Sequence, residues 1–218
     1  IFGHPAPRGS PKLWLGATGD DDAGSSSGSA YVFRTSDGGA TYGQVAKLTA
    51  SDRAAGDAFG YSVASAGDTV VIGAQNDDDG GSSSGSAYVF RTTDGGATYG
   101  QVAKLTASDA AASDNFGWSV AIAGDTVVVG AWGDDDGGSA SGSVYVFRTT
   151  DGGATYGQVA KLTAADAASG DGFGKYVAID GDTIVVGAPG AGTGGAVYIF
   201  STTDGWTTHT EIKLTASD

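Results

Sequence analysis

Aspartate clusters are the residues best suited to chemistry in this chain. Triplets recur at 20–22, 77–79 and 134–136, each in a loop rich in Gly and Ser. Adjacent carboxylates repel one another, and a bound cation would relieve that repulsion. Ca²⁺ takes six to eight oxygen ligands from flexible loops of this kind. The sequence therefore suggests Ca²⁺ sites, although solvated acidic turns that favour solubility are an equally simple interpretation. The candidate ligands are Asp20, Asp22, Asp77, Asp79, Asp134 and Asp136.

A second pair of aspartates precedes each internal Phe-Gly dipeptide. The pairs are Asp52 and Asp57, Asp109 and Asp114, and Asp166 and Asp171. They could complete a cation site with the triplets, or cap turns through side-chain hydrogen bonds to backbone amides. We expect the capping role.

Candidate binding residues come from positions at which otherwise near-identical segments differ. Tyr61 and Trp118 follow Phe-Gly, and Gln75 and Trp132 follow Gly-Ala. These positions adjoin turns or strand ends, where binding residues concentrate. They predict a surface for a carbohydrate or an extracellular protein, whereas relaxed packing demands explain the same variation. Serine runs in the acidic loops are O-glycan candidates or polar filler: Ser25, Ser26, Ser27, Ser82, Ser83 and Ser84.

Catalytic machinery has little support. His4 and His209 are the two histidines, and they share no repeat position. Nothing in their surroundings orders a Ser–His–Asp arrangement. The sequence therefore predicts that the chain is not an enzyme.

The elements that must position these residues repeat every 57 residues. The segment DGGATYGQVAKLT begins at Asp37, Asp94 and Asp151. Phe-Gly occurs at the same spacing, at residues 2, 59, 116 and 173. One such unit cannot bury its apolar face alone and must pack on its neighbours. We expect a single repeat domain over 1–218, with units 2–58, 59–115, 116–172 and a shortened 173–218.

Each unit reads as four short antiparallel strands. In the second unit, residues 61–65 alternate with period two and 69–74 are β-branched, which is typical of strands. Two more strands are expected at 86–91 and 99–106, the last anchored by Val102 and Leu105. Such a four-stranded unit is typical of a β-propeller blade. The fold class is thus all-β, a propeller-like array of four blades.

The end units depart from the pattern. Pro5, Pro7 and Pro11 fall where the first unit should place its first strand. Proline cannot donate to a strand ladder, so that strand is expected to be missing or at an edge. The fourth unit lacks the aspartate triplet.

The composition limits the classes of partner that the chain could bind. Lys and Arg total 11 against 25 Asp and Glu, giving a net charge of −14. Phosphate binding needs a basic surface, so the charge argues against nucleic acid as a partner and equally disfavours an anionic membrane surface. No apolar run approaches the ~20 residues of a membrane span. Cysteine is absent, which excludes disulfides and thiolate sites.

The motifs resemble a known family. Phe-Gly followed by SVA, GDTVVVGA and GSVYVF resembles the FG-GAP repeat of integrin α-subunit propellers. The resemblance implies an extracellular or cell-surface protein in adhesion and ligand binding, often with Ca²⁺. The family's DxDxDG loop is replaced by short turns around Asp68, Asp125 and Asp182, so its ligands are not carried over.

Two functions follow as expectations. The first is an extracellular structural or adhesion protein that assembles with copies of itself or with further repeats, as a larger ring or a fibril, since open arrays expose strand edges. The alternative is a Ca²⁺-dependent module that binds carbohydrate or protein.

Overall fold

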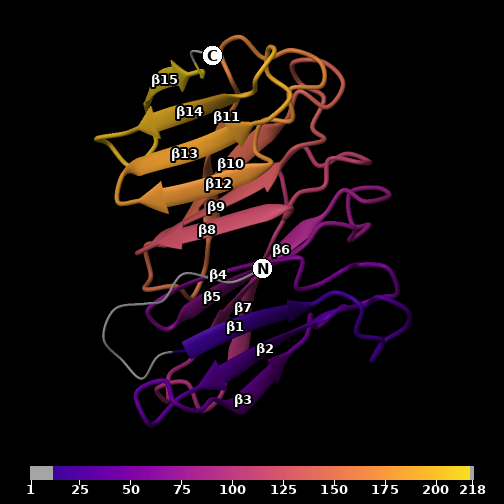
Figure 1. Ribbon diagram of the computed structural model, residues 1–218, viewed down its shortest axis with the longest axis vertical. Helices are drawn as coiled ribbons and strands as arrows, with labels where there is room; N and C mark the ends of the chain where they lie inside the picture. Colours follow the sequence, from indigo (N-terminus) through magenta and orange to yellow (C-terminus); the bar gives the residue numbers. More distant parts are fainter. Residues whose placement is uncertain (1–11, 217–218) are drawn as a thin grey trace.

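The computed structural model describes residues 12–216, which form strands and turns without any helix. In this range no helix is long and apolar enough to cross a lipid bilayer. Four antiparallel sheets follow one another along the chain and stack in that order from the indigo end to the yellow end (Figure 1).

Each sheet is a simple meander whose neighbouring strands are consecutive in sequence. The first sheet contains β1 (Lys12–Ala17), β2 (Ser29–Arg34) and β3 (Gly43–Leu48). The second contains β4 (Ser62–Ala66), β5 (Thr69–Ala74), β6 (Ser86–Arg91) and β7 (Gly100–Leu105). The third contains β8 (Ser119–Ala123), β9 (Thr126–Ala131), β10 (Ser143–Arg148) and β11 (Gly157–Leu162). The fourth contains β12 (Tyr176–Asp180), β13 (Thr183–Ala188), β14 (Ala196–Ser201) and β15 (Thr210–Leu214).

The strands lie where the alternation of residue types predicts them. A two-residue turn links β4 to β5, and Gly67 adopts a φ of +57° there, as hairpin turns require. The propeller-like all-β prediction is confirmed. The prediction that the first strand of the first unit is missing or at an edge concerns residues 1–11, which lie outside the described residues.

One detail of the last strand in the first three sheets differs from expectation. In the second sheet Val89 pairs with Ala103 and Phe90 pairs with Gln101, so Val102 is an extra, bulged residue. Its side chain is 37% exposed, whereas Leu105 is buried. Val102 is therefore not the predicted core anchor, because the bulge turns it outward.

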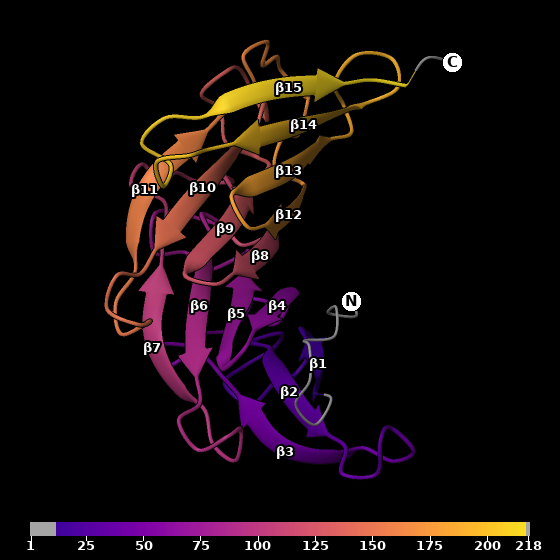
Figure 2. The same ribbon diagram turned by 90° about the vertical axis from the view of Figure 1, so that its left-hand side faces the viewer.

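The apolar cores lie between successive sheets. Buried residues form three clusters, and each combines side chains of two neighbouring sheets. The second cluster, for example, joins Val71 and Val89 of one sheet to Val127 and Tyr145 of the next. The sheets fan along an arc, with β4, β8 and β12 on its inner side (Figure 2). No described sheet has a core of its own, as expected for a repeat unit.

Candidate functional site

The acidic loops converge on a lysine in each inner sheet. In the second sheet the Lys104 ammonium lies 3.1 Å from the Asp77 carboxylate and also contacts Asp79. Asp52, from the segment between the first and second sheets, completes the group at 2.7 Å. Tyr88 places its ring 5.2 Å below the ammonium, and its hydroxyl donates to Asp77 at 2.6 Å. Strands β6 and β7 thus supply the tyrosine and lysine, and two loops supply the carboxylates.

The third sheet repeats this arrangement. Lys161 contacts Asp109 at 2.7 Å, Asp134 at 3.0 Å and Asp136 at 2.6 Å. The Tyr145 hydroxyl lies 2.8 Å from both Asp109 and Asp134. Asp134 is only 4% exposed, so this ion pair is largely removed from water. The same geometry in two units shows that it is a property of the repeat.

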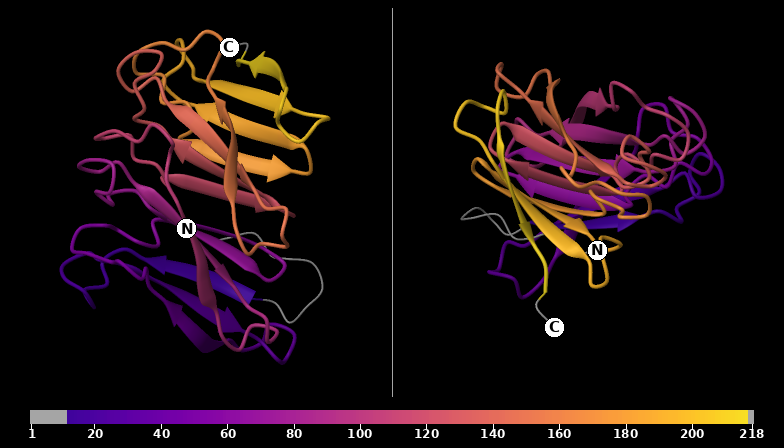
Figure 3. Two further views of the ribbon diagram at one scale, coloured as in Figure 1. Left: turned by 180° about the vertical axis from the view of Figure 1, so that it is seen from behind. Right: turned by 90° about the horizontal axis from the view of Figure 1, so that it is seen from above.

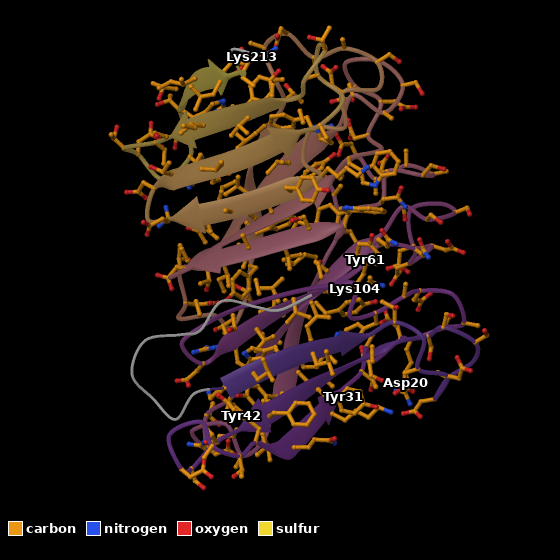
Figure 4. All side chains as sticks on the ribbon, viewed as in Figure 1. Asp20, Tyr31, Tyr42, Tyr61, Lys104 and Lys213 are labelled. Atoms are coloured by element: carbon orange, nitrogen blue, oxygen red, sulfur yellow. The ribbon has the colours of Figure 1, made fainter. Side chains whose placement is uncertain are left out.

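The outer sheets carry reduced versions. In the first, Lys47 contacts Asp20 at 2.9 Å and also Asp22. In the fourth, Asp166 is the one acidic partner of Lys213 within residues 12–216, since that loop has no triplet. Asp20, Lys104 and Lys213 are labelled in Figure 4, in which the first two lie toward the side where the long loops project.

The residues of the second-sheet group shift one another's pKa values. Burial lowers the pKa of Lys104, but the hydrogen bonds that its ammonium donates to Asp52, Asp79 and Asp77 outweigh this effect and hold that pKa above its ordinary value. Burial raises the pKa of Asp52, yet hydrogen bonds from Lys104 and Tyr88 keep it below the usual range. Burial and the neighbouring Asp77 raise the pKa of Tyr88. At neutral pH the second-sheet group therefore contains a neutral Tyr88 phenol, a Lys104 ammonium and an ionised Asp52 carboxylate.

These groups could also hold a metal ion. One oxygen from each of Asp52, Asp77 and Asp79 lies within 4.8 Å of the others, as is true of Asp109, Asp134 and Asp136. The ammonium already occupies the space that such an ion would take, and a dication beside it would be repelled. The residues fit Ca²⁺ only if the lysine moves away.

The lysine was missed by sequence reasoning, although a signal existed. Lys47, Lys104, Lys161 and Lys213 occupy one repeat position in a chain with few basic residues. A lysine that recurs with the same 57-residue period as an acidic loop predicts an ion pair between the two.

The two aspartates of each linker have separate roles. Asp52 and Asp109 join the lysine groups, as one of the two interpretations proposed. Asp57 and Asp114 instead accept hydrogen bonds from the amides of Ala54 and Ala111, at 2.6 and 2.7 Å. Burial raises the pKa of Asp114 above its ordinary value.

Most of the variable positions do gather in space. Tyr61 and Trp118 lie 4.7 Å apart between ring centroids, and Trp118 and Trp132 lie 5.4 Å apart. The Lys175 ammonium sits 5.0 Å from the Trp132 ring and 5.6 Å from the Trp118 ring. We call Tyr61, Trp118, Trp132 and Lys175 the aromatic cluster. Gln75 occupies the repeat position of Trp132 one sheet earlier and is 9% exposed.

The serine runs divide into buried and accessible members. Ser27 and Ser84 are fully buried, and their hydroxyls donate to the carbonyl oxygens of Asp20 and Asp77. Glycosylation there would break the loops, so the accessible O-glycan candidates are Ser25, Ser26, Ser82 and Ser83.

Comparison with known sequences identifies the repeat. A sequence profile described as the FG-GAP repeat matches residues 42–90, 99–147 and 156–200, together more than half of the chain. Each match begins one residue before the last strand of one sheet and ends in the third strand of the next. A search of curated proteins found no match.

Solved structures share the arrangement of sheets. One is Sqt1 of Saccharomyces cerevisiae, at a TM-score of 0.54 and 13% identity over 98% of this chain and 46% of the other. Another is the alpha-L-arabinanase of Penicillium chrysogenum, with a TM-score of 0.58 and 12% sequence identity. That match covers 99% of this chain and 67% of the arabinanase. The chain thus spans less than half the length of Sqt1. At these identities the likeness shows the fold alone.

The arabinanase corrects one prediction. The sequence-based prediction that the chain is not an enzyme is wrong, because a protein with this fold is named as an arabinanase, which is an enzyme. The structural likeness assigns no catalytic residue, since fold does not determine chemistry.

Proposed function

The chain belongs to the FG-GAP repeat family, and on that premise we propose that it is an extracellular structural or adhesion module that assembles with copies of itself. One observation carries the proposal. Strands β5 and β9 are buried at every residue, whereas in β13 buried residues alternate with partly exposed ones, and Val185 among these is 37% exposed. The fourth sheet is therefore built to be covered on both faces and is covered on one.

The test is the dependence of mass on concentration. We expect the weight-average mass from light scattering to rise with protein concentration, because burying the free apolar face is favourable. Electron micrographs of the concentrated sample should show rings or filaments. A chain that stays a monodisperse monomer throughout the series would contradict the proposal.

The aromatic cluster favours a second candidate function, carbohydrate binding. Amphipathic rings are typical of recognition surfaces, and the Trp132 indole nitrogen is buried without a hydrogen-bond partner. The four residues come from β-strand ends of three successive sheets, and Tyr61 is labelled in Figure 4. The acidic groups already hold lysines, so we expect such binding to be independent of Ca²⁺.

A glycan array tests this candidate. Trp132→Ala is expected to lower the affinity for any glycan that binds by about tenfold, because one aromatic contact contributes about 1.4 kcal/mol of binding free energy. Tyr42→Ala is the control, since Tyr42 is 44% exposed and is labelled far from Tyr61 in Figure 4. Equal signals from both variants, or no signal from the native chain, would exclude the site.

A further inference from the structure

The Phe-Gly dipeptide forms the joint between successive sheets. The amide of Phe116 donates to the carbonyl of Ser84, in the preceding sheet's loop, at 2.9 Å. The Phe116 ring packs edge to face on Tyr145, 5.4 Å away, in the sheet that follows. Phe59 and Phe173 make the same two contacts. Each dipeptide therefore rests its backbone on one sheet and its ring on the next.

Two glycines of the preceding sheet make room for that backbone. A Cβ on Gly73 would overlap the carbonyl oxygen of Gly117, and one on Gly85 would overlap that of Phe116. The third sheet repeats this with Gly130 and Gly142 against Gly174 and Phe173. The glycine pair is thus the seat for the dipeptide of the next unit.

The fourth sheet presents the same seat on its free face. Gly187 and Gly195 hold these repeat positions, and the nearest atom to a Cβ on Gly187 belongs to the Tyr176 side chain, at 3.2 Å. Beside them lies a hollow of about 320 Å³ lined by Ala188, Ala196, Val197 and Leu214, among others. Val197 is 40% exposed and Leu214 is 50% exposed, whereas their equivalents Val144 and Leu162 are fully buried. The free face is visible in the view from above in Figure 3.

The first sheet presents the complementary face. Leu15 is 42% exposed, and Leu13, Tyr31 and Phe33 are half-buried. Their equivalents in the second sheet, Val70, Ile72, Tyr88 and Phe90, all lie in a core between sheets. The sequence also places Phe2-Gly3 one period before Phe59-Gly60.

We propose that the free face of the fourth sheet binds the first sheet of a second copy, with Phe2-Gly3 of that copy on the seat formed by Gly187 and Gly195. This contact would continue an interface that the chain already makes three times from nearly the same residues. The inference rests on the proposed assembly and names its two surfaces. Since the surfaces differ, the contact is head-to-tail and yields a ring or a filament. Salt should strengthen it by screening the −14 charge of each copy.

Two variants of the full chain test the contact. Gly187→Ala blocks the seat, while the exposed Tyr176 ring can turn aside and leave the fold intact. Phe2→Ala removes the inserted ring. Each variant alone is expected to be monomeric by light scattering, whereas an equimolar mixture should form a one-to-one dimer through the remaining good pair of faces. Gly157→Ala is the control, since a Cβ there meets nothing within 4 Å.

The outcomes separate the two proposals. A native chain that assembles, while Gly187→Ala assembles equally well, would overturn this contact and leave the proposed function standing. A mixture of the variants that stays monomeric would also overturn the contact. A native chain that never assembles would overturn both. Circular dichroism of each variant confirms that loss of assembly is not loss of folding.

Discussion

Gly130→Ala is expected to destabilise the chain by about 3 kcal/mol, with a matching fall in the urea midpoint. A Cβ at this position would lie well under 3.0 Å from the carbonyl oxygen of Gly174. Both groups belong to backbone, so no rotamer change can relieve the overlap. Relief requires the third and fourth sheets to separate, which exposes the cluster containing Val128 and Tyr198.

The matched control is the same substitution one repeat later. Gly187 occupies the equivalent position on the free face of the fourth sheet, where the nearest atoms of the described residues belong to the flexible Tyr176 side chain. Gly187→Ala should therefore change the urea midpoint little when measured on dilute, monomeric protein. Equal losses in the two variants would show that the glycine serves its own strand and not the contact between sheets.

Lys161→Met is expected to lower the free energy of unfolding by about 2–3 kcal/mol at neutral pH. This value lies between those typical of surface and of buried ion pairs. The substitution keeps the aliphatic stem but leaves Asp109, Asp134 and Asp136 facing one another without a cation. Asp134 is buried, so it cannot recover its hydration. Urea denaturation measures the loss.

The effect of Ca²⁺ on the melting temperature tests whether the Lys161 ammonium takes the place of a metal ion. In the native chain we expect equal melting temperatures in Ca²⁺ and in chelator, because the ammonium fills the site. In Lys161→Met the three carboxylates become available, and Ca²⁺ should raise the melting temperature. Lys213→Met is the control: among the residues that the structure describes its one acidic partner is Asp166, so the loss should be smaller and Ca²⁺ should have no effect. A native chain stabilised by Ca²⁺ would show that the lysine yields to the metal.

Much of the fold could be predicted from the sequence because the copies reinforce one another. The alternation at 61–65, the turn at Gly67 and the β-branched run at 69–74 recur in phase, so local and global signals agree. The bulge at Val102 could not be predicted, because it depends on the register of two strands rather than on one. The fourth sheet has no such shift, since β15 is one residue shorter than β7.

The candidate site was predicted in part. The aspartates stood out by their clustering, but the lysine that neutralises them lies 25 residues from Asp79 in sequence. Pairing across that distance is decided by how β6 and β7 fold back beside the loop. The gathering of Trp118, Trp132 and Lys175 likewise depends on the approach of two sheets. Long-range contacts of this kind carry no local sequence signal.

A single excised unit tests most directly the claim that no sheet has a core of its own. In residues 59–115, Val70 and Ile72 would lose their partners from the first sheet, and Val71 and Val89 those from the third. The two-dimensional amide NMR spectrum of this fragment should therefore show the narrow dispersion of an unfolded chain, while the full chain gives a dispersed spectrum. A well-dispersed spectrum and cooperative unfolding of the monomeric fragment would contradict the account.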